Sequence, residues 1–278
     1  MSAFDPPRGI VRKLVADALA EDVGILGDIT SLACIDDERA RAAFIARSDG
    51  VLAGTALATE TYRQLDDAIS VDWRVVDGES VASGAQLGEV SGTLRTILTG
   101  ERTALNFLCH CSGIATATHR YVMAVGGRTR ILDTRKTLPG LRAVQRAAVR
   151  AGGGFNHRDS LSDAVLIKDN HLAATGIAKS IERARSAWPG RLIEIECDTI
   201  EQVGEARAAG ADRVLLDNMG PEEVREAVAL LEGSAEVEVS GGITLENIRA
   251  YADSGADFIS VGALTHSVVV FDIGLDML

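Results

Sequence analysis

The sequence predicts an α/β protein in which a small N-terminal α+β domain precedes an incomplete, open parallel α/β barrel. From about residue 129, short apolar runs that end in charged residues alternate with helical stretches, whereas the preceding part of the chain mixes helix and strand patterns. Strands that alternate with helices at this spacing predict a parallel sheet. Polar residues repeated at the strand ends favour a barrel over a Rossmann sheet, and no Gly-x-Gly-x-x-Gly follows a strand.

The first 110 residues carry the mixed patterns of the smaller domain. Apolar periodicity and Gly-containing turns separate its helices from its strands. The expected elements, in order, are a helix over 8–20, strands over 43–46 and 51–54, a helix over 55–67, several short strands through Val90, and a helix over 101–108.

Two motifs in this part invite other interpretations. Residues 76–88 resemble the strand-turn rhythm of a lipoyl or biotinyl carrier domain, but no lysine that could be modified occurs between Lys13 and Lys136. Cys109-His110-Cys111 suggests zinc, but it continues the helical pattern, and residues two apart on a helix point to nearly opposite faces. Both stretches are therefore expected to be structural.

The barrel strands follow from about residue 129, and about six of them are clear, short of the usual eight. The intervening helices carry start signals: Thr199 with Gln202 makes a capping box, and Pro221 is a first-turn proline. The apolar runs are Ile131-Leu132, Ala164-Val165-Leu166-Ile167, Leu192-Ile193-Glu194-Ile195-Glu196, Val214-Leu215-Leu216, Val237-Glu238-Val239 and Phe258-Ile259-Ser260-Val261.

Composition limits the possible partners and locations. The net charge of −12 argues against general affinity for nucleic acid or for an anionic membrane. No apolar run approaches the roughly 20 residues of a membrane span, and no basic segment leads into an apolar one at the N-terminus. We therefore expect a cytoplasmic protein whose anion site is local.

The charged residues after the strands predict a catalytic site. Because the carboxyl ends of barrel strands converge on one mouth, we expect these side chains to become neighbours. A single charge at a strand end is more often solvated or paired, for example with Asp163, but like charges held together cost free energy unless a ligand neutralises them. The converging residues are Arg135, Lys136, His157, Arg158, Lys168 and His171, with the acids Glu194, Glu196 and Asp217.

The mixture of signs predicts the chemistry of the ligand. Arginine binds carboxylate or phosphate, and lysine acts as a point charge on phosphate. Carboxylates in the same mouth would hold Mg²⁺ against substrate phosphates. Ser240-Gly241-Gly242 and Val261-Gly262-Ala263 follow the last two strands, where barrels bind phosphate through backbone N–H groups. His266, just beyond, is a candidate phosphate donor or a surface histidine.

Long motifs occur in order along nearly the whole chain, and they closely resemble one enzyme family. They are Glu21-Asp22-Val23-Gly24, Gly27-Asp28-Ile29-Thr30, Gly100-Glu101-Arg102-Thr103-Ala104-Leu105-Asn106-Phe107-Leu108, Asp133-Thr134-Arg135-Lys136-Thr137-Leu138-Pro139-Gly140-Leu141-Arg142, Gly152-Gly153-Gly154-Phe155-Asn156-His157-Arg158, Leu166-Ile167-Lys168-Asp169-Asn170-His171, Leu216-Asp217-Asn218-Met219 and Ile259-Ser260-Val261-Gly262-Ala263-Leu264-Thr265-His266-Ser267. The resemblance is to the quinolinate phosphoribosyltransferases, or carboxylating nicotinate-nucleotide pyrophosphorylases.

The resemblance implies a fold and an activity. The fold is an N-terminal α+β sandwich domain over 1–110, with 268–278 as a candidate addition, and an open barrel over 111–267, in a homodimer or higher homo-oligomer with shared active sites. The activity is that of nicotinate-nucleotide diphosphorylase (carboxylating), EC 2.4.2.19, a pentosyltransferase of de novo NAD biosynthesis. It converts quinolinate and phosphoribosyl pyrophosphate into nicotinate mononucleotide, pyrophosphate and CO₂, with Mg²⁺ and no organic cofactor.

The resemblance also implies roles for individual residues. Arg135, His157, Arg158 and Lys168, assisted by Thr134, would hold the two carboxylates of quinolinate, and Arg102 would reach into the partner's site. Lys136, Glu196 and Asp217 would be catalytic and engage phosphoribosyl pyrophosphate, with Glu196 and Asp217 as Mg²⁺ ligands. Ser240, Gly241, Gly262 and His266 would hold its phosphates.

One departure from the family pattern and two other interpretations stay open at this stage. Arg146-Ala147 replaces a Lys-Tyr pair of the family, which puts fine substrate positioning in question. A related paralogue, associated with molybdenum transport or acting on nicotinate, is the nearest alternative, although a monocarboxylate would not need so many cationic side chains. A non-catalytic sensor that keeps the site is the other, and the acids Glu196 and Asp217 argue against it.

Overall fold

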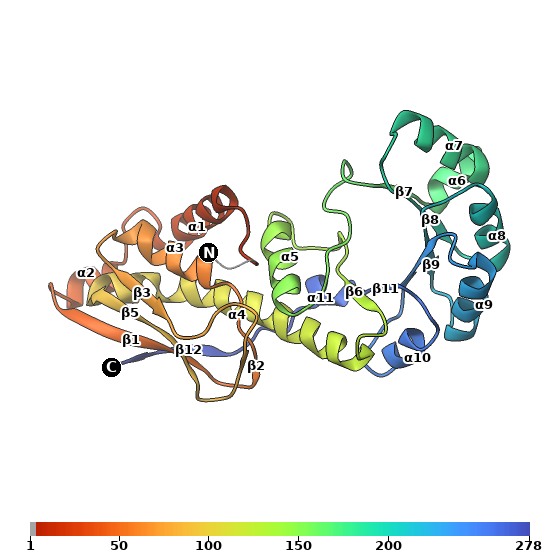
Figure 1. Cartoon of the computed structure of the whole chain (residues 1–278). Helices are drawn as coiled ribbons and strands as arrows, with labels where there is room; N and C mark the ends of the chain where they lie inside the picture. The colour runs from red at the N-terminus through yellow and green to blue at the C-terminus, as the bar shows by residue number, and fades with distance from the viewer. Residues whose placement is uncertain (1–3) are drawn as a thin grey trace. The chain divides into compact units, whose positions relative to one another are not determined.

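A computed structural model describes residues 4–278, and the chain divides into two compact units. The first comprises the chain up to His119 together with Thr137–Gly153 and Leu264–Leu278. The second comprises Arg120–Lys136 and Gly154–Ala263. Each unit has its own sheet (Figure 1).

The first unit contains a four-stranded antiparallel sheet in the order β12-β1-β5-β3. Strand β1 (Arg39–Ala46) pairs with β5 (Gln86–Thr93) on one side and with β12 (Ile273–Met277) on the other. Strand β3 (Ser70–Trp73) lies beyond β5, and β2 (Gly50–Val51) forms a separate ribbon with β4 (Ser80–Val81). A segment that follows the barrel in sequence therefore completes the N-terminal sheet.

Helices pack on this sheet around an aromatic core. Phe44 stacks on Trp73 with ring centroids 4.9 Å apart and meets the edge of Tyr62 at 6.4 Å. Phe44 and Tyr62 are fully buried, so their apolar area contributes to the stability of the unit. Of the helices in this unit, α3 (Thr55–Leu65) and α4 (Leu94–Val125) supply residues to this core; the others are α1 (Arg8–Val23), α2 (Ile29–Cys34), α5 (Arg142–Ala151) and α11 (Ala263–His266).

The expected strand over 51–54 is wrong beyond its first residue. Of this stretch, only Val51 pairs in β2. The N–H groups of Val51 and Ala53 donate to Thr116 Oγ1 and Ser112 Oγ of α4 at 2.9 and 3.0 Å, whereas that of Leu52 donates to Glu79 O at 3.1 Å. The next residue, Gly54, turns left-handed with φ 98° to begin α3. Hydroxyl groups of α4 thus take two of the N–H groups that a longer strand would use. The predicted helix through Cys109 and Cys111 is confirmed as part of α4.

The second unit is built on a six-stranded parallel sheet in the order β6-β11-β10-β9-β8-β7. Among the described residues, the edge strands β6 and β7 do not pair with each other, so the sheet curves without closing. This confirms the predicted incomplete α/β barrel. The strands are β6 (Arg130–Leu132), β7 (Val165–Ile167), β8 (Ile193–Cys197), β9 (Arg213–Asp217), β10 (Glu236–Ser240) and β11 (Phe258–Ser260).

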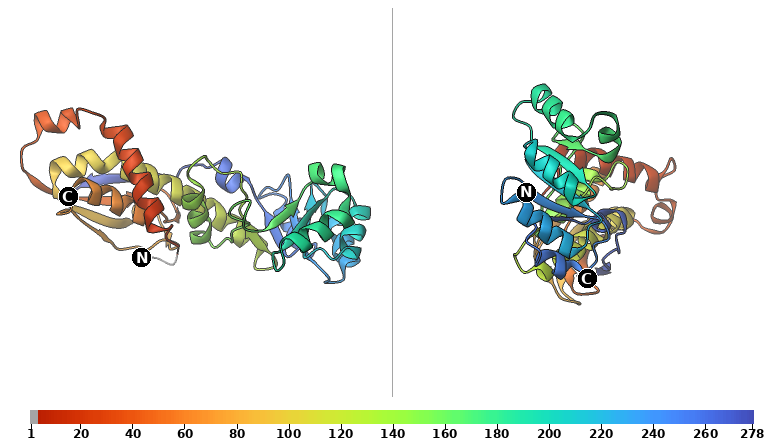
Figure 2. Two further views of the ribbon diagram at one scale, coloured as in Figure 1. Left: turned by 90° about the horizontal axis from the view of Figure 1, so that it is seen from above. Right: turned by 90° about the vertical axis from the view of Figure 1, so that its right-hand side faces the viewer.

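Helices cover the outer face of this sheet, and Figures 1 and 2 show α7, α8 and α9 side by side there. The predicted start signals are confirmed: Thr199 caps α8 in a capping box with Gln202, and Pro221 opens α9. None of the described helices has the length and apolar character needed to cross a membrane. The helices are α6 (Asp169–Thr175), α7 (Ile177–Ala187), α8 (Ile200–Ala208), α9 (Pro221–Leu231) and α10 (Ile248–Ala252).

Candidate active site

A cavity of about 240 Å³ lies at the carboxyl ends of the parallel strands in the second unit. Charged side chains of both signs line it, as the sequence predicts for a barrel mouth. The lining residues are Thr134, Arg135, Lys136, His157, Arg158, Leu166, Lys168, Glu196, Leu215, Asp217, Glu238, Ser240 and Ser260.

Strand alternation places these side chains. Successive strand residues point to opposite faces of a sheet. In β10, Val237 and Val239 are buried in the core, while Glu238 and Ser240 line the cavity. In β9, Leu215 and Asp217 line the cavity and the residues between and before them are fully buried. The inner face of the sheet is therefore polar because the strand sequences alternate.

A larger groove, of about 910 Å³, lies in the first unit. It is lined by residues of α1, α3 and β3, among them Val11 and Trp73. One of its acids, Glu60, is already paired with Arg63 at 2.6 Å and with Arg12 at 3.8 Å. Charges that neutralise one another in this way do not attract an anionic substrate, so the smaller cavity is the candidate active site.

Two arginines form a cationic wall of that cavity. The Nε atoms of Arg135 and Arg158 are buried and have no hydrogen-bond partner among the described residues. Burial, together with the charge of Arg135, lowers the pKa of Arg158. Buried donors without partners and neighbouring like charges both cost free energy. An anion bound between the two guanidinium groups would remove both costs.

A buried carboxylate fixes the loops that carry this wall. Asp133, directly after β6, is 0% exposed. It accepts hydrogen bonds from Asn156 Nδ2 at 2.6 Å and from the backbone N–H of His157 at 2.8 Å. Thr134 Oγ1 accepts from the backbone N–H of Lys136 at 3.1 Å. The first residue of the Asp-Thr-Arg-Lys-Thr motif is therefore an anchor, while the next three residues line the cavity.

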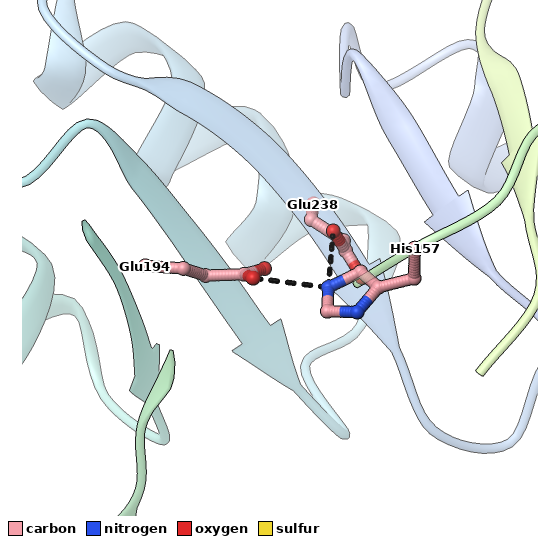
Figure 3. Close-up of side chains that lie close together, drawn as sticks. All are labelled: His157, Glu194 and Glu238. Carbon is pink, nitrogen blue, oxygen red and sulfur yellow. Dashed lines mark hydrogen bonds and ion pairs between the residues drawn. The ribbon is translucent and has the colours of Figure 1, made fainter. Parts of the chain in front are cut away.

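His157 lies between two buried carboxylates from different strands. Its Nε2 is 2.9 Å from Glu194 of β8 and 3.4 Å from Glu238 of β10 (Figure 3). Burial alone would lower the pKa of His157, but hydrogen bonds to Glu194 and Glu238 outweigh it and raise the pKa to about 10. Burial and the charge of Glu238 raise the pKa of Glu194 to about 7. At neutral pH His157 is therefore a cation.

The acidic side of the cavity combines Glu196 and Asp217 with Lys168. Lys168 Nζ forms an ion pair with Glu196. Burial and the charge of Glu196 raise the pKa of Asp217, which means that the two carboxylates repel one another. Two hard oxygen donors in this arrangement are suited to a divalent cation such as Mg²⁺.

The ends of β9 and β10 approach each other closely. Asn218, after β9, has φ 57°, and its backbone N–H donates to Ser240 O at 2.8 Å. Gly241 has φ 95°, and a Cβ there would lie 2.1 Å from Asn218 Oδ1. Glycine is therefore required at this position on both conformational and steric grounds.

The remaining predicted residues lie elsewhere. Gly241 follows β10 directly, and Gly262 lies two residues after the end of β11. Arg102 is exposed on α4 in the first unit. His266 is exposed at the end of α11, where Nδ1 shares a 2.7 Å hydrogen bond with Ser267 Oγ. His171 does not line the cavity, because its Nδ1 accepts from the backbone N–H of Lys168 at 3.0 Å at the start of α6.

Two cavity residues were not singled out from the sequence. Glu238 and Ser260 both line the cavity, and Ser260 Oγ donates to Glu238 Oε1 at 2.5 Å. The sequence feature that could have indicated them is Glu238 itself, since a charged residue in the middle of an apolar strand must have a buried partner. The identity of that partner depends on which strands become neighbours.

Comparison with known proteins identifies the family. Residues 28–112 match the model of the quinolinate phosphoribosyl transferase N-terminal domain, and residues 114–276 match that of its C-terminal domain. The nicotinate-nucleotide pyrophosphorylase [carboxylating] of Mycobacterium leprae is 43% identical, with 99% of this chain and 98% of that protein covered. The probable enzyme of that name from Bacillus subtilis is 41% identical, with 96% and 93% covered.

A solved structure agrees with these matches. The nicotinate-nucleotide pyrophosphorylase of Francisella tularensis superposes with a TM-score of 0.96 at 41% identity, and the match covers 100% of both chains. The similarity thus extends over both units and over every strand that supplies the cavity. This chain therefore belongs to the quinolinate phosphoribosyltransferase family.

Proposed function

We propose that this chain transfers the phosphoribosyl group of phosphoribosyl pyrophosphate to quinolinate with decarboxylation, giving nicotinate mononucleotide, pyrophosphate and CO₂. One observation carries the proposal: cationic side chains and the carboxylates of Glu196 and Asp217 converge in one cavity of a chain that belongs to this family. A substrate with two carboxylates and a second with several phosphates would match both sets.

The cationic set suits quinolinate. Arg135 and Arg158 have buried donors without partners, and His157 carries a positive charge at neutral pH. We assign these three residues, with Lys168 and the hydroxyl of Thr134, to the two carboxylates. Guanidinium groups bind carboxylates in bidentate fashion. A nicotinate-specific enzyme would have to leave part of this charge uncompensated.

The opposite side of the cavity suits phosphoribosyl pyrophosphate. We assign Lys136 and Ser240 to its phosphates, together with Gly241, Gly262 and His266. Glu196 and Asp217 are the residues that would hold Mg²⁺, because both line the cavity and their charges repel each other. Bound Mg²⁺ would neutralise charge on the departing pyrophosphate.

The reaction makes different demands on the two sets. As the C1–O bond to pyrophosphate breaks, positive charge develops on the ribose, and the carboxylates of Asp217 and Glu196 stabilise it. The pyridine ring is held through its carboxylates by the cationic set. Its nitrogen forms the new bond to C1 and becomes quaternary. The ring then accepts the electron pair of the breaking C–CO₂ bond, and a proton replaces CO₂ at that carbon.

We further propose that the active enzyme is a homodimer or higher homo-oligomer, in which Arg102 on α4 contributes to the cavity of a partner subunit. An exposed arginine on a helix is available for such a role. The cytoplasmic location stays a prediction.

The test is a direct assay. Purified protein with Mg²⁺, phosphoribosyl pyrophosphate and quinolinate labelled in the carboxyl group lost should release labelled CO₂ in step with nicotinate mononucleotide. Turnover of nicotinate in place of quinolinate would refute the assignment and favour a paralogue. Omission of Mg²⁺ with a chelator present should abolish turnover.

A further inference from the structure

A ladder of alternating charges, buried except at its Glu236 end, includes the cavity residues His157 and Glu238. Arg213 of β9 contacts Glu236 at 2.7 Å and Glu238 at 3.3 Å. Glu238 in turn contacts His157, which contacts Glu194. Glu194 and Glu238 are 1% and 0% exposed, so this ladder is part of the barrel interior.

Nε2 of His157 lies within 3.4 Å of both buried carboxylates, and the one guanidinium of the ladder, that of Arg213, is shared by Glu238 and Glu236. A doubly protonated His157 places a positive charge between Glu194 and Glu238. A neutral ring would leave these buried carboxylates with less compensation, which is costly. Figure 3 shows Nε2 directed between the carboxylates of Glu194 and Glu238.

We propose that Glu238 and Glu194 are positioning residues that fix the ring of His157 and hold it as an imidazolium, so that it presents positive charge to a substrate carboxylate. This inference rests on the proposed function, in which His157 binds quinolinate. Glu238 and Glu194 themselves act only through His157.

The same three side chains could instead be read as a metal site, since their ligand atoms lie within 4.8 Å of one another. The contacts of Glu238 argue against this, because its Oε1 already accepts from Ser260 Oγ and its Oε2 from Arg213. The groups that face His157 from the surrounding elements are Glu194 of β8, Arg213 of β9, Glu238 of β10, Asp133 after β6, and the cavity residues Arg135, Lys136, Arg158, Lys168, Glu196 and Asp217.

Steady-state kinetics separate this role from general stabilisation. Glu238→Gln keeps the shape of the side chain but removes its charge. We expect the KM for quinolinate to rise on the order of tenfold to a hundredfold, as for loss of a charged hydrogen bond, and the KM for phosphoribosyl pyrophosphate to stay within about twofold. The variant Glu194→Gln should also raise the KM for quinolinate, and it replaces Glu238→Gln in the test if Glu238→Gln does not fold.

Glu236→Gln is the matched control. Glu236 lies on the same strand and contacts the same arginine, but it is exposed and does not contact His157. This variant should leave both KM values unchanged. An equal rise in the quinolinate KM for Glu236→Gln and Glu238→Gln would assign the effect to Arg213 and overturn the proposal.

The second readout does not depend on turnover. Nitrogen-15 NMR of labelled histidine rings resolves at most five residues, and a His157→Gln variant assigns the signal. In the unaltered protein His157 should remain doubly protonated to about pH 9, given its pKa of about 10. In Glu238→Gln its titration should move toward the ordinary value of 6.5, and the quinolinate KM should then rise with pH.

Unchanged His157 titration and unchanged quinolinate KM in folded Glu238→Gln and Glu194→Gln would overturn the inference, as would a stoichiometric metal ion bound to His157. Absence of quinolinate turnover by the unaltered protein would instead refute the proposed function, while the NMR titration would still report on the ladder.

Discussion

Replacing Gly241 with alanine should destabilise the barrel, and the structure gives the magnitude. Gly241 has φ 95°, and its new Cβ would lie 2.1 Å from Asn218 Oδ1 and 3.0 Å from Asn218 N. The left-handed backbone costs an alanine roughly 1–2 kcal/mol, and overpacking adds typically about 1–3 kcal/mol. We therefore expect Gly241→Ala to lower the free energy of unfolding by roughly 2–5 kcal/mol.

Gly242 supplies the matched control for this prediction. It has φ 63°, and a Cβ there would meet no atom within 4 Å. Gly242→Ala should therefore show only the backbone cost, roughly 1–2 kcal/mol. The difference between the two variants isolates the contact with Asn218.

Urea unfolding followed by far-ultraviolet circular dichroism measures both variants. Adding Asn218→Gly to Gly241→Ala removes the clashing side chain and should recover part of the loss, because glycine also tolerates the φ of 57° at that position. Equal stability of Gly241→Ala and Gly242→Ala would refute the reasoning, since the contact with Asn218 would then add nothing to the free energy of unfolding that the variant loses.

Three further predictions follow from the site and its supports. Asp133→Asn should raise the quinolinate KM and lower the free energy of unfolding by roughly 1.5–3 kcal/mol, because the buried carboxylate accepts from Asn156 and His157; unchanged kinetics and stability would remove its anchoring role. Lys136→Ala should reduce kcat on the order of a hundredfold if it stabilises the departing pyrophosphate, whereas unaltered turnover would exclude it from the mechanism. Asp28→Ala should cost about 1 kcal/mol above pH 5 through loss of the cap on Ser31. Hydrogen bonds from Ser31 lower the pKa of Asp28 below 3.8 in the folded protein. The stabilisation by Asp28 is therefore present above the pKa of the unfolded chain and is lost as the pH falls through the pKa of the folded protein. A stability difference between the variant and the unaltered protein that grows on acidification would contradict this prediction.

The sequence predicted the barrel well because its local signals agree. Runs such as Ile131-Leu132 and Phe258-Ile259 became β6 and β11 where expected. Capping signals at Thr199 and Pro221 marked helix starts that local chemistry determines. The strand expected over 51–54 ends after Val51 because hydroxyl groups of α4, distant in sequence, take two of its N–H groups and Gly54 turns left-handed.

The site was predictable as a set of charges but not as a network. Convergence at the strand ends brought Arg135, Lys168 and Asp217 to one cavity. Glu194 and Glu238 meet at His157 because β8 and β10 flank β9 and both side chains point to the inner face of the sheet. No local sequence pattern predicts this strand order. The apolar strand around Glu238 indicates that this residue needs a buried partner. Which residue is the partner depends on the order of the strands in the sheet.

The pairing of β12 with β1 has a consequence for biosynthesis. Because β12 follows the barrel in the chain, one edge of β1 stays unpaired until the ribosome has translated every strand of the second unit. An unpaired edge strand is a template for pairing with another chain. The first unit therefore completes its sheet only after the barrel strands have been synthesised, and nascent chains stalled within the barrel should be the species most prone to aggregate.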